Sequence, residues 1–188
     1  MFGIEALKHV DPQGLYGRFI KEGLRPDGRG LKTARKVTIT QEDKQQQNFQ
    51  PRFHVRLGQT AVLCGISCQI AVPNQNIKGK SEGFLIPVLH VGGICSPLAR
   101  GGIPTDHTLA ITSSLTRILQ CANLFSLSDL CIVQDRAVWA LYIDVVCLND
   151  DGNLLDASLI AILAALKNCK FLFISFPYFF SIFKFQIK

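Results

Sequence analysis

Three carboxylates stand within or just after the most apolar stretch of the chain. Residues 138–148 are mostly β-branched or otherwise apolar, with Asp144 inside the run and Asn149-Asp150-Asp151-Gly152 directly after it. Carboxylates at the end of a strand can hold Mg²⁺ and assist phosphate chemistry. The same residue types also form strand-to-helix turns, because Asp and Gly favour turn geometry. We expect Asp150 and Asp151 to shape this turn and to favour the start of the following helix, with Mg²⁺ binding as the alternative.

Asp144 poses a separate problem, because a carboxylate inside an apolar strand must find a partner. A strand as apolar as residues 138–148 is expected to be buried on both faces. We therefore expect Asp144 to form a salt bridge or a hydrogen bond to a loop, and catalysis is the alternative. Ser113, His107 and Asp144 supply the residue types of a hydrolase triad, but nothing in their spacing predicts that they meet.

The cysteines and histidines do not predict a metal site. The seven cysteines include no C-x-x-C pair, and the four histidines are scattered. Zinc sites need closer ligand spacing, so we expect neither a metal nor another cofactor. An odd number of dispersed cysteines without a signal peptide indicates a reducing compartment. Cys64 and Cys68 lie four residues apart in a strand-like run, which places them on one face as small core residues.

Positive charge is concentrated in the first half of the chain. Residues 1–80 carry 13 Lys and Arg against 6 Asp and Glu, whereas residues 81–169 carry 4 against 8. A basic half suggests a surface for RNA, DNA or an acidic partner, and a merely solvated face is the alternative. Five arginines are the candidates for RNA contact, in a turn, on the polar side of a strand and in a Gly-rich loop: Arg25, Arg29, Arg52, Arg56 and Arg100. For the first four, contact with a neighbouring subunit is the other possibility.

The periodicity predicts an α+β domain with a mixed sheet and helices on one side. A short amphipathic helix is expected over 11–23, followed by a Pro- and Gly-containing turn over 25–30. Strands are expected over 34–40, 52–57, 60–72, 84–91 and 138–148. Thr105 is a good N-cap for a helix that runs to about Ala122, and an Ala- and Leu-rich helix follows the acidic turn. Its lack of a clear polar stripe predicts burial on both faces.

We divide the chain into an N-terminal helical segment (1–23), a domain (24–169) and a divergent tail (170–188). The tail holds 7 of the 13 phenylalanines. Its apolar stretch is interrupted by Pro177 and is short for a membrane span, which needs about 20 apolar residues. A membrane-tethered variant is therefore a minor alternative, and no stable membrane association is expected.

Four segments in this order resemble the RNase PH family: RPDGRG (25–30), LGQTAVLC (57–64), residues 83–91, and residues 144–156 followed by an Ala-rich helix. The similarity covers about residues 20–168, and within the family the sequence most resembles a eukaryotic exosome ring subunit. It implies an RNase PH-like (ribosomal protein S5 domain 2-like) fold whose C-terminal part is missing here. It also implies the other ring and cap subunits and RNA as partners, and the nucleus, nucleolus and cytoplasm as locations.

Active members of that family use inorganic phosphate to cleave RNA from its 3′ end, which requires cations around the phosphate. The resemblance places several arginines on the helix that matches residues 105–122. Thr112, Ser113, Ser114 and Thr116 stand there instead, and only Arg117 remains. A second acidic residue is expected beside Asp144, where Val145 and Val146 stand. We therefore expect a non-catalytic subunit that supports rRNA maturation and mRNA turnover by scaffolding and by forming an RNA path, with an active phosphate-dependent 3′-to-5′ exoribonuclease as the alternative.

Overall fold

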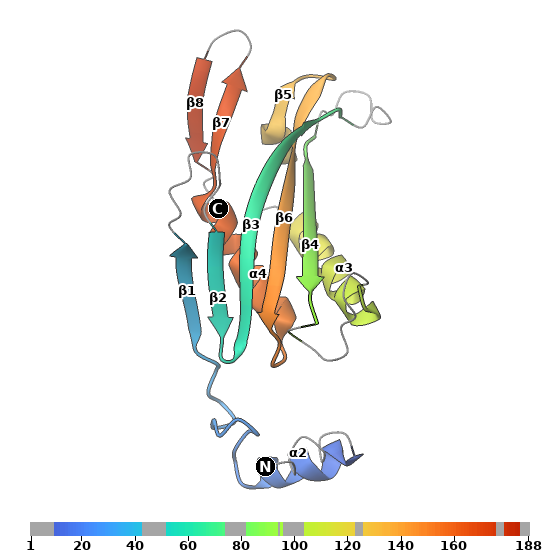
Figure 1. Ribbon diagram of the computed structural model, residues 1–188, viewed down its shortest axis with the longest axis vertical. Coiled ribbons are helices and arrows are strands. Elements are labelled where there is room, and N and C mark those ends of the chain that lie inside the picture. The colour runs from blue at the N-terminus through green and yellow to red at the C-terminus, as the bar shows by residue number, and fades with distance from the viewer. Residues whose placement is uncertain are drawn as a thin grey trace. The chain divides into compact units, whose positions relative to one another are not determined.

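The computed structural model describes residues 10–42, 52–73, 82–93, 95, 104–122, 126–175 and 179–184, with side chains as far as Cys169. The chain divides into two compact units, Met1–Arg35 and Lys36–Lys188. The elements in chain order are α2 (Pro12–Lys21), β1 (Val37–Glu42), β2 (Arg52–Leu57), β3 (Thr60–Ala71), β4 (Phe84–Val91), α3 (Asp106–Cys121), the 3₁₀ helix η1 (Leu127–Leu130), β5 (Cys131–Val133), β6 (Ala137–Asn149), α4 (Leu154–Asn168), β7 (Lys170–Ser175) and β8 (Phe179–Lys184) (Figure 1).

The first unit contains α2 and the turn that follows it. Asp11 is the N-cap of α2, and its carboxylate accepts a hydrogen bond from the Gly14 N–H at 2.9 Å. Pro12 fits the first turn because its missing N–H would have had no helical partner there. The chain leaves the helix through Gly23, whose φ of +74° suits glycine. The helix therefore begins and ends close to the predicted bounds.

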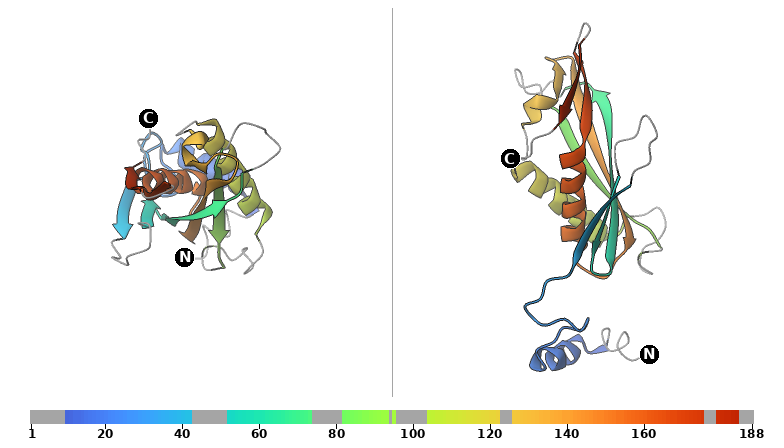
Figure 2. Two further views of the ribbon diagram at one scale, coloured as in Figure 1. Left: turned by 90° about the horizontal axis from the view of Figure 1, so that it is seen from above. Right: turned by 90° about the vertical axis from the view of Figure 1, so that its left-hand side faces the viewer.

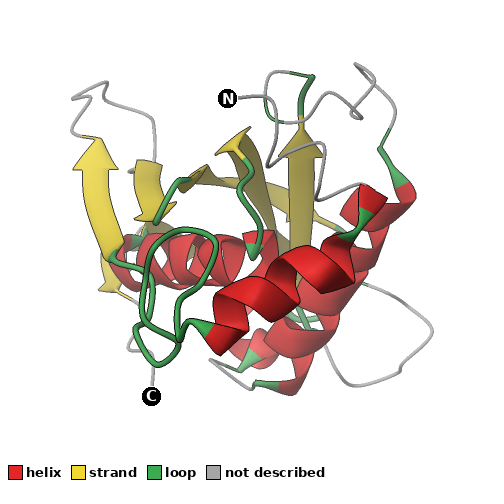
Figure 3. Ribbon diagram, turned by 90° about the horizontal axis from the view of Figure 1, so that it is seen from below, coloured by secondary structure: helices red, strands yellow, loops and turns green. Residues whose placement is uncertain are grey.

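The second unit is built on a mixed sheet with the strand order β1-β2-β3-β6-β4, to which β5 adds beside β6. Only β4 runs parallel to β6, and the other pairs are antiparallel. Helix α4 packs on β2, β3 and β6, and α3 packs on β4. Both helices lie on one face of the sheet, as the side view in Figure 2 and the view from below in Figure 3 show. The predicted mixed sheet with helices on one side is confirmed.

The core lies between this face of the sheet and α4. Alternate residues of β6, namely Leu141, Ile143, Val145 and Cys147, are buried, as are Val55 of β2 and Val62 of β3. Helix α4 contributes Ala157, Ala161, Ile162, Ala165 and Leu166. At about 25 cal/mol for each Å² of buried apolar surface, this layer is the main source of stability for the unit.

Two sequence-based expectations about burial are wrong. Residues 142–148 of β6 alternate between buried and accessible side chains, because the helices cover only one face of the sheet. Val146, on the opposite face, is 37% exposed. The outer side of α4 is also only partly covered, with Leu155, Leu159 and Ile160 half-buried.

A further difference concerns α3 and the tail. Helix α3 ends one residue before the expected Ala122, which is its exposed C-cap, and the helix buries Ile111, Leu115 and Leu119 against the sheet. Residues 170–175 and 179–184, for which no secondary structure was predicted, pair as the antiparallel hairpin β7-β8. Among the described residues, no helix is both long enough and apolar enough to cross a membrane.

Candidate functional site

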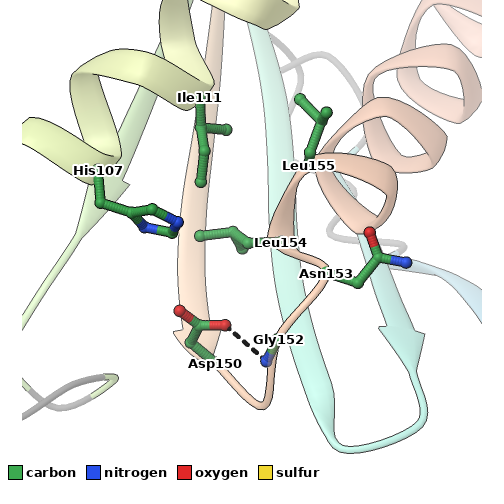
Figure 4. Close-up of a pocket in the computed structure, with 7 residues that line it drawn as sticks. All are labelled: His107, Ile111, Asp150, Gly152, Asn153, Leu154 and Leu155. Carbon is green, nitrogen blue, oxygen red and sulfur yellow. Dashed lines mark hydrogen bonds between the residues drawn. The ribbon is translucent and has the colours of Figure 1, made fainter.

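A pocket of about 300 Å³ opens where the first turn of α3 faces the junction between β6 and α4. Its lining comes from both helices and from the acidic turn: His107, Ile111, Asp150, Gly152, Asn153, Leu154 and Leu155. Figure 4 shows the His107 ring reaching from α3 toward Leu154 and Asp150. The pocket thus joins two segments, residues 107–111 and 150–155, that lie about 40 residues apart in the sequence.

The turn that forms the floor of the pocket is fixed by its own polar groups. The Asp150 carboxylate accepts a hydrogen bond from the Gly152 N–H at 3.0 Å (Figure 4). Gly152 and Asn153 both adopt positive φ angles, +82° and +60°. These conformations suit glycine and are tolerated by asparagine, which explains why this pair occupies the corner between strand and helix.

Thr60, at the start of β3, holds the same turn from the side. Its side chain is fully buried, and its hydroxyl donates to the Gly152 carbonyl at 2.7 Å while accepting from the Asp151 N–H at 3.0 Å. The Asn149 side-chain amide donates to the Gln59 carbonyl at 2.8 Å. The turn between β2 and β3 therefore holds the acidic turn in place, and Asp150 and Asp151 have a structural role within it.

The pocket has the geometry of an anion site without its usual cations. Asn153 is the N-cap of α4, but its side chain makes no capping hydrogen bond and instead donates to the Asp156 carboxylate at 2.8 Å. The N–H groups at the start of a helix favour anions. The seven described lining residues include no Lys or Arg, however, and Asp150 adds a negative charge beside the helix end. In the described part of the chain, no group of three His, Cys, Asp or Glu side chains is arranged to hold a metal ion.

Three hydroxyl groups of α3 are engaged within their own helix. Thr112, Ser114 and Thr116 each donate to the backbone carbonyl four residues earlier, at 2.8 to 2.9 Å. Such back-bonding satisfies a hydroxyl locally. These side chains therefore do not present free donors to a bound phosphate.

Asp144 lies on the face of the sheet that carries no helices. It pairs in register with Gly65 of β3 and Val88 of β4, and its carboxylate lies 3.7 Å from Nε2 of His90 on β4. The side chains of Asp144 and His90 are 50% and 57% exposed. The expected salt-bridge partner is thus present when His90 is protonated, but it comes from a neighbouring strand and not from a loop. Since α3 packs on the other face, Ser113 and His107 do not meet Asp144 as a triad.

Arg25 and Arg29 stabilise the turn that follows α2. The Arg25 guanidinium donates to the Leu31 carbonyl at 2.7 and 3.1 Å. Arg29 donates to the Asp27 carboxylate at 2.6 Å and to the Thr33 carbonyl at 2.7 Å. The hydrogen bond from Arg29 lowers the pKa of Asp27. These contacts give both arginines a local structural role in the unit Met1–Arg35.

Arg52 and Arg56 lie on β2, where they point away from the helices and are exposed, with His54 half-buried between them. They pair in register with Glu42 and Thr38 of the edge strand β1. Arg52 also covers Gly65, because a Cβ at Gly65 would meet its Cγ at 3.7 Å. The structure brings Arg52, Arg56 and Asp144 to one face of the second unit. Arg100 lies outside the described residues.

The pocket itself was not predicted from sequence. The sequence indicates Asp150, but nothing in it predicts that His107 and Asn153 line a site. The available signal was the Asp-Gly-Asn corner placed before a helix, since residues that favour positive φ expose a helix N-terminus.

Comparison with known proteins supplies the family context. Residues 35–171 match the family described as the 3′ exoribonuclease family, domain 1. The chain is 32% identical to exosome complex component rrp43 of Schizosaccharomyces pombe, over 87% of this chain and 59% of the relative. It is 34% identical to exosome complex component Rrp42 of Methanosarcina acetivorans, over 81% and 55%. The chain thus spans a little over half the length of these curated relatives.

A solved structure agrees with this placement. The Archaeoglobus fulgidus exosome with RNA bound to its active site contains a chain that superimposes with a TM-score of 0.75 and 30% identity, over 84% of this chain and 61% of that one. A rice Rrp46 structure has a TM-score of 0.52 at 18% identity, which supports the fold alone.

Proposed function

The chain belongs to the RNase PH family of 3′ exoribonucleases, and residues 35–171 match domain 1 of that family. We therefore propose that the chain is a non-catalytic subunit of an exosome core ring. Its role would be to complete the ring and to help guide RNA to nucleases on other subunits, in rRNA maturation and mRNA turnover. Its partners would be the other RNase PH-like subunits, the cap subunits and RNA. The named relatives are themselves exosome components, which supports this assignment.

One observation carries the non-catalytic part of the proposal: the pocket between α3 and α4 contains a carboxylate and, among its described lining residues, no Lys or Arg. Phosphorolysis brings an anionic phosphate against an anionic RNA, and charge builds further on the transferred phosphoryl oxygens. A guanidinium fork provides paired, charged hydrogen bonds to such oxygens. Helix N–H groups beside Asp150 replace neither this charge nor these donors.

The RNA-contact part of the proposal is carried by Arg52 and Arg56, which are exposed on the same strand and point to the same side. Arg25, Arg29 and Arg100 stay predictions for RNA contact, and the first two already have local partners. A location in the nucleus, nucleolus and cytoplasm follows from the same proposal, as does the division into the segment 1–23, the domain 24–169 and the tail 170–188.

The test has two readouts. The purified chain is first incubated with single-stranded 3′-hydroxyl RNA and inorganic phosphate, and we expect no release of nucleoside diphosphates above a mock preparation. Release would support the active exoribonuclease instead. The chain is then co-expressed with the other ring subunits of the same organism, and we expect it to co-purify with them in a stoichiometric complex. Its absence from that complex would contradict the scaffold role.

A further inference from the structure

Two cysteine thiols meet where the end of α4 packs against β3. Cys68 lies on β3 at the same parity as Cys64 and Ile66, so it faces the helices, and it is half-buried. Cys169 is the C-cap of α4 and is 1% exposed within the core. A hydrogen bond joins the two thiols. The contact therefore links the inward face of the sheet to the residue at which the last helix ends.

The hydrogen bond shifts the pKa values of the two thiols in opposite directions. The S–H group of Cys169 stabilises a Cys68 thiolate, which lowers the pKa of Cys68 although burial opposes this. The same bond, together with burial, raises the pKa of Cys169. Cys68 is also the more accessible of the two sulfurs, since it is half-buried whereas Cys169 is 1% exposed, so an oxidant reaches Cys68 first and Cys169 is the second thiol beside it.

We propose that Cys68 and Cys169 form an oxidation site at which a hydroperoxide converts the two thiols to a disulfide that ties β3 to the end of α4. The Cys68 thiolate attacks the terminal oxygen of the hydroperoxide, the O–O bond breaks, and the alcohol or water leaves after taking up a proton. This produces a sulfenic acid on Cys68. The Cys169 sulfur then attacks the Cys68 sulfur, the S–S bond forms, and the hydroxyl leaves as water with the Cys169 proton. One hydroperoxide is reduced and two thiols are oxidised.

A second pair of neighbouring cysteines provides an internal comparison. The Cys95 thiol donates a hydrogen bond to the backbone carbonyl of Cys147. Burial is the largest cause that raises the pKa of Cys147 to about 12, and its contact with Cys95 adds to this. Cys147 therefore stays a thiol at neutral pH, which makes it a poor nucleophile toward a peroxide.

The bond would restrict the chain where the helical layer ends and β7 begins. It would close a loop of about 100 residues, and a cross-link of that length removes much of the freedom of the unfolded chain. We expect the oxidised chain to melt about 10 °C higher than the reduced chain, the order of magnitude for such a loop in a domain of this size. A reductant should reverse the shift.

The test uses the full chain, treated with a small excess of hydrogen peroxide at pH 7, then blocked with N-ethylmaleimide and digested with trypsin. Cleavage after Arg56, Lys78, Lys167 and Lys170 separates peptide 57–78 from peptide 168–170. The proposal predicts one disulfide-linked species containing both peptides, and fragmentation should place the link on Cys68. Two alkylated thiols should be lost from the seven.

Matched variants make the assignment specific. The Cys68→Ser and Cys169→Ser variants should each lose the linked species, whereas Cys64→Ser and Cys121→Ser should keep it. A link through Cys64 would overturn the proposal, as would full alkylation of all seven thiols or oxidation of Cys68 to the sulfinic acid without a link. If a serine variant is insoluble, fragmentation of the linked peptides from the parent chain decides the question.

Discussion

A substitution at Thr60 tests whether the acidic turn is held in place by the hydroxyl of this residue. It bridges the two turns at one end of the sheet, since it donates to the Gly152 carbonyl at 2.7 Å and accepts from the Asp151 N–H at 3.0 Å. Its side chain is fully buried. The Thr60→Val substitution keeps the volume of the side chain and removes both hydrogen bonds, so it isolates the contribution of the hydroxyl.

The magnitude follows from the number of bonds that are lost. Each neutral hydrogen bond contributes about 1 kcal/mol to stability, and a partner left without a bond adds to the cost. We expect Thr60→Val to lower the free energy of unfolding by about 2–3 kcal/mol. In a domain of this size, that corresponds to a melting temperature lower by about 4–10 °C.

Urea denaturation followed by circular dichroism measures the effect, with Thr60→Ser as the control. Serine keeps the hydroxyl and loses one methyl group, so we expect it to cost about 1 kcal/mol. Valine should therefore be less stable than serine at an unchanged slope with urea. If the Thr60→Val variant is as stable as the parent chain, or more stable than Thr60→Ser, the hydroxyl does not hold the turn. A structural role for Asp150 and Asp151 then loses its support.

Three further predictions concern other parts of the second unit. Replacing Arg52 and Arg56 by Ala should weaken RNA binding and flatten its salt dependence, because phosphate contacts release counterions; an unchanged salt slope in a filter-binding assay would exclude these contacts. Gly83→Ala should destabilise the fold by about 1–3 kcal/mol, since the new Cβ would lie 2.7 Å from the Trp139 carbonyl oxygen; thermal unfolding measures this, and an unchanged melting temperature would show that the sheet adapts. Cys64, whose pKa is raised to about 12 mainly by burial and secondly by Asp144, should react with iodoacetamide at pH 8 far more slowly than the exposed cysteine at the end of α3, and comparable rates in peptide mass spectrometry would contradict this.

Periodicity predicted the elements of the core well, because burial on one face leaves a repeating pattern in the sequence. The alternation over 52–57 places Val55 inside and Arg56 outside, as the structure does. Thr105 was predicted as the N-cap of α3, and its side chain accepts the Thr108 N–H at 3.3 Å. Local residue types thus determine these elements almost independently of their surroundings.

The arrangement around Asp144 and the pocket could not be predicted in the same way. Whether a strand is covered on one face or two depends on where the helices pack, and the apolar run 138–148 wrongly indicated cover on both faces. His107 reaches the pocket only because α3 and the acidic turn are brought together by the sheet. Such contacts between distant segments depend on topology, which a single sequence does not specify.

A non-catalytic role requires that the pocket between α3 and α4 does not hold phosphate. Titration of the full chain with inorganic phosphate, followed by phosphorus NMR line width, tests this claim most directly. We predict no saturable binding up to about 10 mM, a concentration at which a site with the affinity of a working substrate pocket would be filled. Saturable binding in the millimolar range or below, weakened by an Asn153 substitution or strengthened by Asp150→Asn, would exclude the non-catalytic assignment and favour an active phosphorolytic enzyme.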